Sequence, residues 1–106
     1  MLSQPISASA SGVNPVVPAT PGRRIRVLGF LLSGAAAVNV QWQDGAAANL
    51  SGLLTIPAAG ANLVAPIAPP VVGSGQYWMI TGLSQALVLN LSAAVAVGGI
   101  VVFDVL

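Results

Sequence analysis

The closing stretch of the chain, residues 86–105, has the clearest pattern of hydrophobic and polar positions. Within it, leucine occupies every second position over residues 87–91, and the positions between are mixed. A period of two residues is typical of a β-strand with one buried face. Over residues 95–105 both sets of alternate positions are largely apolar, which indicates a strand covered on both sides. We therefore predict two closing strands in a small β domain whose outer surface packs against something else.

The most regular alternation occurs earlier, over residues 37–44. There Val38, Val40 and Trp42 share one side of the predicted strand and polar residues share the other. Trp42 is therefore expected in the core, and the Asp-Gly pair that follows predicts a turn. Four more strands are predicted, at residues 24–32, 49–56, 62–67 and 76–81.

Gly, Pro, Asn and Ser separate these predicted elements. Pro66 makes the strand at 62–67 an edge strand at best, because proline donates no hydrogen bond to a neighbouring strand. Residues 68–75 have the composition of a loop. About seven short strands at such spacing predict an all-β protein, a small jelly-roll-like β-sandwich spanning residues 23–106.

The first 22 residues are predicted to form an extended N-terminal arm. They are rich in Ser, Ala and Pro, and proline is incompatible with a helix interior or a central strand. We expect the arm to be flexible in isolation and ordered on a neighbour, with Val13, Val16 and Val17 as its docking residues. The basic and apolar regions of a signal peptide are not seen in it.

Charge is the unusual quantity. Charged residues make up 5% of the chain, whereas about 25% is ordinary for a soluble domain. With 56% hydrophobic residues, the chain would expose a largely apolar surface, and such surfaces normally mark interaction sites. We therefore expect the chain to self-associate, with outward-facing residues at the interface: Tyr77, Trp78, Ile100 and Val102. Because Tyr77 and Trp78 are neighbours, they are expected to point to opposite faces.

The net charge of +1 comes from one cluster, Arg23, Arg24 and Arg26. These arginines could contact an acidic partner, but a nucleic-acid-binding protein usually carries a broader basic face interleaved with aromatic residues. We expect them to solubilise the start of a strand and to donate a salt bridge, with no nucleic-acid partner.

The residue types that usually carry catalysis are scarce. The chain has no His, Cys, Lys or Glu, so most general bases and activated nucleophiles are excluded. Asp44 and Asp104 are the two carboxylates, and both lie near predicted strand ends, where such groups are normally solvated. Two carboxylates are too few for a dedicated metal site. We predict no enzyme activity and no catalytic, metal-binding or cofactor-binding residues.

Two further functions remain open at this point. Tyr77 or Trp78 could stack on a glycan, which would make the chain a sugar-binding module. Residues 86–103 are 18 residues without a charge, which meets the minimum length for a membrane-spanning helix. The leucine alternation, Asn90, the glycine pair at 98–99 and the lack of a basic flank argue against that helix. We expect no membrane partner.

Three strand-and-turn motifs resemble small structural proteins of tailed bacteriophages. The first begins at Gly22 with Arg-Arg-Ile-Arg-Val-Leu-Gly-Phe, and the second is Val-x-Val-x-Trp-x-Asp-Gly over 38–45, followed by Leu-Ser-Gly at 50–52. The most specific is Leu-x-Leu-Asn-Leu-Ser-x-x-Val-x-Val-Gly-Gly-x-Val-x-Phe over 87–103. The similarity covers residues 20–106, and the Pro-Pro and Gly-Ser-Gly within 65–82 depart from it.

The resemblance implies a virion protein, in particular a capsid decoration or cement protein with a β-sandwich fold. Such proteins commonly form homotrimers on the capsid surface, where the partner is the major capsid protein. The three arginines would then contact acidic residues of the shell, and the N-terminal arm would dock on it. A β module of the phage tail, neck or fibre is the alternative within the same class.

Overall fold

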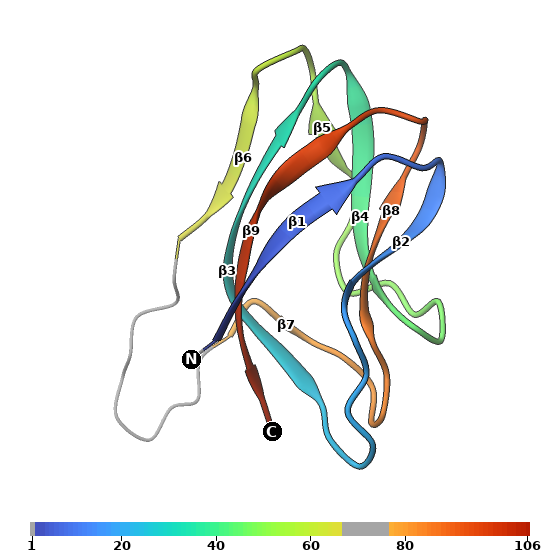
Figure 1. Ribbon diagram of the computed structural model, residues 1–106, viewed down its shortest axis with the longest axis vertical. Helices are drawn as coiled ribbons and strands as arrows, with labels where there is room; N and C mark the ends of the chain where they lie inside the picture. The colour runs from blue at the N-terminus through green and yellow to red at the C-terminus, as the bar shows by residue number, and fades with distance from the viewer. Residues whose placement is uncertain (1, 67–76) are drawn as a thin grey trace.

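A computed structural model describes residues 2–66 and 77–106, and it contains nine β-strands and no helix within these residues (Figure 1). The strands are β1 (Leu2–Ala8), β2 (Gly12–Val17), β3 (Ile25–Gly34), β4 (Val38–Asp44), β5 (Leu54–Ile56), β6 (Asn62–Ala65), β7 (Met79–Ile80), β8 (Leu87–Leu91) and β9 (Val97–Val105). The uncharged stretch at 86–103 contributes to two of these strands, and no helix of the described part is long and apolar enough to cross a membrane.

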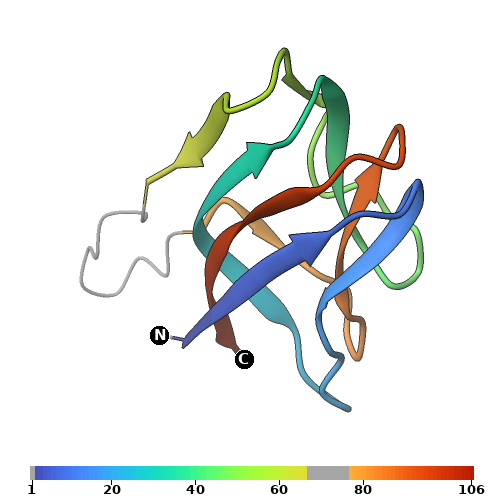
Figure 2. The same ribbon diagram turned by 45° about the horizontal axis from the view of Figure 1, so that its top comes forward.

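The strands form two antiparallel sheets packed face to face, as the two views in Figures 1 and 2 show. Sheet A has the order β1-β9-β3-β6, with the short β7 also paired to β3, and sheet B has the order β2-β8-β4-β5. Early strands thus pair with late ones: β1 with β9, β2 with β8, β3 with β6, and β4 with β5. This is a long antiparallel hairpin rolled into two layers, the topology of a jelly roll. The prediction of an all-β, jelly-roll-like sandwich is confirmed.

The seven strands predicted from alternation correspond to β3 through β9. Trp42 lies in the core with no exposed surface, and β6 is an edge strand, both as predicted. The largest differences in length are in β5, which begins only at Leu54, and in β7, which covers only two residues. The predicted loop at 68–75 lies outside the described residues.

The N-terminal residues differ from the expected free arm. They supply β1 at the edge of sheet A and β2 at the edge of sheet B, and they bury Ile6 and Ala8 beneath the sandwich surface. Edge strands accept Pro5 and Pro15, because on the outer side of an edge the missing N–H has no partner to lose. The prolines thus correctly indicated that these residues do not form a central strand. They are compatible with the edge strands that the structure shows.

The core lies between the two sheets and is built from the inward positions of both. Among its fully buried members are Val27, Leu32 and Val101 of sheet A and Leu89 of sheet B. Burying one such side chain contributes about 1.5–3 kcal/mol. Phe30 and Trp42 join the layers by an aromatic contact, with ring centroids 5.3 Å apart.

Gly99 allows β9 to approach β3 closely. Its φ is +150°, and a Cβ atom built at this position would overlap the carbonyl oxygen of Leu31. No other residue type avoids that overlap, so glycine at position 99 has a structural reason within a strand.

Candidate interaction surface

The outer face of sheet A carries a row of apolar side chains that crosses β1, β9, β3 and β6. Pro5 lies opposite Ile100, Ile100 opposite Leu31, and Leu31 opposite Val64. Residues directly opposite each other in paired strands project from the same face. All four are exposed, with Leu31 at 39%, Ile100 at 41% and Val64 at 65%. We call these four residues the apolar row.

Small or uncharged residues flank the apolar row on both sides. One neighbouring row consists of Ser7, Gly98, Ser33 and Asn62. On the other side Val102 lies opposite Ser3 on β1 and Gly29 on β3, and its side chain is half-buried. Ile100 and Val102, two of the predicted interface residues, therefore lie on one face of one strand.

The other two predicted interface residues lie at the β7 edge of sheet A. Tyr77 and Trp78 immediately precede β7, and the backbone N–H of Trp78 donates a hydrogen bond to the carbonyl of Val27. Both side chains are exposed, Tyr77 at 47% and Trp78 at 54%. Both side chains are therefore accessible, and their place in an interface stays a prediction.

An ion pair neutralises the charges that sheet A carries on its strands. Arg26 of β3 lies opposite Asp104 of β9, and its Nη2 donates a hydrogen bond of 2.9 Å to Oδ2 of Asp104. This hydrogen bond lowers the pKa of the Asp104 carboxyl below its usual value. Arg26 is the salt-bridge donor that the sequence predicted.

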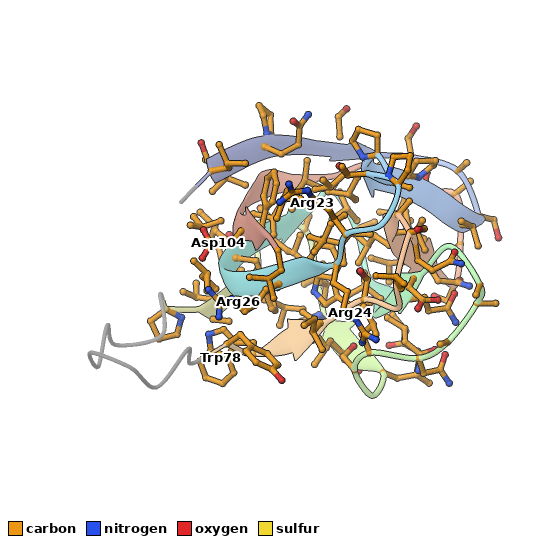
Figure 3. The ribbon with its side chains drawn as sticks, turned by 90° about the horizontal axis from the view of Figure 1, so that it is seen from below. Arg23, Arg24, Arg26, Trp78 and Asp104 are labelled. Carbon is orange, nitrogen blue, oxygen red and sulfur yellow. The ribbon has the colours of Figure 1, made fainter. Side chains whose placement is uncertain are left out.

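The three arginines do not form one basic patch. Arg23 and Arg24 are exposed just before β3, and Figure 3 shows them at positions apart from each other and from Arg26. An acidic contact of Arg23 and Arg24 with a shell protein stays a prediction. Arg26 is already engaged within its own chain.

The predicted docking valines are divided by the fold. Val13 is 54% exposed on β2, opposite Asn90 of β8, and Val16 is half-buried. Val17 is only 4% exposed and belongs to the core. The prediction that Val17 contacts a partner is therefore wrong, because its side chain points between the sheets.

The outer face of sheet B carries amide side chains that bind one another, beside the exposed Val13 and Pro15 of β2. The Nδ2 of Asn90 donates to Oε1 of Gln43, and the Nε2 of Gln43 donates to Oδ1 of Asn49. Nearby, the Nε2 of Gln41 donates to the carbonyl of Ser51. Because these amides already have partners, the apolar face of sheet A is the better candidate for docking.

A proline lies in or next to each of the four strands that stand at the ends of the two sheet orders. Pro5 is in β1 and Pro15 in β2, while Pro57 directly follows β5 and Pro66 directly follows β6. Proline on an edge opposes pairing with a strand of another molecule, as edge lysines do in many proteins. This chain has no lysine, so proline takes that role. These prolines therefore disfavour pairing of another strand with the edges of the sheets that they flank.

Asp44 is a structural residue that the sequence reasoning misplaced. It is 4% exposed, not solvated, and its carboxylate accepts hydrogen bonds from the backbone N–H groups of Ala46, Ala48 and Gly82. The Asp-Gly turn was predicted, but the contact with Gly82 comes from a segment 38 residues away. Asp44 thus ties the end of β4 to the segment before β8.

The two carboxylates have separate surroundings, one in this turn and one beside Arg26. Within the part of the chain that the structure describes, no three His, Cys, Asp or Glu residues gather where they could hold a metal ion.

Comparisons of the chain with protein-family models, with curated proteins and with solved structures find no match.

Proposed function

We propose that this chain is a structural protein of a bacteriophage virion that decorates or cements the capsid. It docks through the outer face of sheet A, with the major capsid protein as its partner and further copies of itself as neighbours in a homotrimer. The observation that carries the proposal is the apolar row on a sheet face whose strand charges are already paired. The resemblance of the strand motifs to tailed-phage virion proteins supplies the virion context.

The energetics of cementing suit such a surface. Burying a few hundred Å² of apolar area per copy contributes several kcal/mol at about 25 cal/mol per Å², before the costs of association. Repetition of the contact over a symmetric shell increases the total through avidity. Rupture of the shell would first have to expose this area again. No ionisable or catalytic side chain is needed for that role.

The jelly-roll topology is compatible with the proposal, because the fold occurs in viral capsid proteins and also in lectins. The sugar-binding alternative requires polar side chains beside an exposed aromatic ring. The indole N–H of Trp78 instead donates to the backbone carbonyl of Pro66. The pocket beside its ring is lined mainly by apolar residues. The structure therefore supports docking to a protein surface better than binding to a glycan.

The test measures binding of the purified full-length chain to two targets. These are shells assembled from the major capsid protein of the same phage, and isolated tails. We expect co-sedimentation with shells to a saturating ratio, and loss of binding in Leu31→Lys, which places a charge in the middle of the apolar row. Leu53→Lys is the matched control, because Leu53 is 67% exposed and lies outside sheet A.

Two outcomes would count against the proposal. Binding to tails but not to shells would move the chain to the tail, neck or fibre alternative. Saturable shell binding that is equally strong in the Leu31→Lys variant would show that the outer face of sheet A is not the docking surface.

A further inference from the structure

A pocket of about 300 Å³ lies along the side of the sandwich where β5 and β6 form the sheet edges. Two largely exposed residues, Val64 and Trp78, mark its mouth, and Phe30 and Trp42 reach it from the core. Among the residues that the structure describes, Leu50, Ser51, Leu54, Ala65 and Met79 also line it. Val64 is its single member that also belongs to the apolar row, so the pocket is a separate feature of the surface.

The lining is apolar and aromatic, and none of the described residues in it is charged. Its one polar side chain, Ser51, is already engaged: its Oγ accepts a hydrogen bond from the backbone N–H of Trp42 and donates one to the carbonyl of Gly52. A sugar or a charged ligand would lose its hydration here without gaining partners. A neutral, largely apolar ligand would not.

The two indole N–H groups of the lining differ. That of Trp78 donates to the carbonyl of Pro66 at 2.8 Å. That of Trp42 is buried and has no hydrogen-bond partner within the described residues. Buried polar groups are nearly always partnered, and an unpartnered one costs about 1–3 kcal/mol. Neither indole N–H is therefore open to a ligand in the pocket, because one is engaged and the other has no exposed surface.

We propose that this pocket binds a compact, neutral aromatic molecule. Phe30 and Trp78 offer ring faces and edges to an aromatic ligand, and the flexible thioether of Met79 makes favourable contacts with aromatic rings. An engineered cavity of about 150 Å³ holds benzene, so twice that volume suits a ligand of two fused rings.

The experiment titrates the full-length chain with indole and records the side-chain N–H signals of both tryptophans by NMR. Trp42 and Trp78 are the two tryptophans of the chain, and both line the pocket, so each signal reports on its occupancy. We expect saturable shifts of both signals. The non-aromatic probe cyclohexanol should bind at least about tenfold more weakly.

The blocking variant is Ala65→Phe, which puts a ring at a lining position of β6. Asn62→Phe is its matched control, because Asn62 is exposed on the same strand and lies outside the lining. We expect about tenfold weaker indole binding in Ala65→Phe and unchanged binding in Asn62→Phe. Trp78→Ala, an exposed position at the mouth, serves as a second variant if Ala65→Phe does not fold.

Three results would overturn the proposal. The first is the absence of a saturable shift up to the solubility limit of indole. The second is equal affinity for cyclohexanol, which would show generic apolar partitioning instead of aromatic recognition. The third is unchanged indole binding in a folded Ala65→Phe or Trp78→Ala variant. The proposal does not depend on capsid binding, so each can fail without the other.

Discussion

Arg26 and Asp104 lie opposite each other on β3 and β9 and are joined by a hydrogen bond of 2.9 Å. Together they account for two of the five charged residues of the chain. Because the pair is on the same sheet as the apolar row, a partner docking there meets no unbalanced strand charge. Both side chains remain partly exposed, at 19% and 26%, so the pair's contribution to stability is expected to be modest.

The ion pair predicts how stability changes in acid. The pKa of Asp104 is lower in the folded chain than its ordinary value of 3.8. The ionised form therefore stabilises the fold above that value, and this contribution is lost as the pH falls through the lowered pKa. We expect Asp104→Asn to reduce the free energy of unfolding by at most about 1 kcal/mol at neutral pH. Urea unfolding at several pH values should also show a weaker acid dependence than in the unmodified chain. An unchanged acid dependence would contradict this.

The apolar row predicts the effect of charge on self-association. Lysine at Ile100, in the middle of sheet A, would have to be desolvated in any interface that uses this face. We expect the unmodified chain to elute as a trimer of the 10.5 kDa protomer and Ile100→Lys to elute as a smaller species, both measured by light scattering on a sizing column. Leu53→Lys should keep the original mass. If the unmodified chain were a monomer, self-association could not explain its low charge.

The Asp44 turn predicts a large loss of stability from a small change. Asp44→Ala leaves three backbone N–H groups without their acceptor. We expect a loss of about 2–4 kcal/mol in the free energy of unfolding, and a smaller loss in Asp44→Asn, which keeps one acceptor oxygen. Ser92→Ala is a suitable comparison, because it removes a single exposed hydrogen bond to the backbone of Asn39. Equal losses in Asp44→Ala and Ser92→Ala would show that the turn is not a special anchor.

The position of the N-terminal strands predicts the result of truncation. Deleting residues 1–20 removes β1 and β2 and uncovers β9 and β8 along their length. We expect the shortened chain to lose cooperative unfolding and its dispersed NMR spectrum, because the core would lack one edge of each sheet. A folded fragment that had lost only its binding to shells would instead restore the idea of a separate docking arm.

The edge prolines predict a change in solubility. Replacing Pro5 and Pro15 together by threonine would supply edge N–H groups and raise the β-propensity of both strands. We expect the double variant to form thioflavin-binding aggregates faster than the unmodified chain under the same conditions. Pro21→Thr, outside any strand, should aggregate no faster. Equal rates in the double variant would mean that the edges are protected by some other feature.

Much of the secondary structure could be predicted from the sequence, because alternation is a local property. Seven of the strands, the core position of Trp42 and the edge position of β6 all follow from which residues recur at every second position and where proline stands. The low charge likewise indicated an interaction surface before any fold was known. None of these features depends on which strand pairs with which.

Pairing and register belong to the tertiary structure alone. Alternation shows that a strand has a buried face, but it does not name its neighbour, and in this jelly roll the neighbours are often far apart in the chain. The Ser- and Pro-rich residues 2–17 form two edge strands because their backbone groups pair with β9 and β8 and their apolar side chains cover the core. The same register aligned Pro5, Ile100, Leu31 and Val64 in one row and brought Gly82 to Asp44. Local sequence therefore determined which faces are buried, and the long-range packing of the two sheets decided which exposed residues lie together.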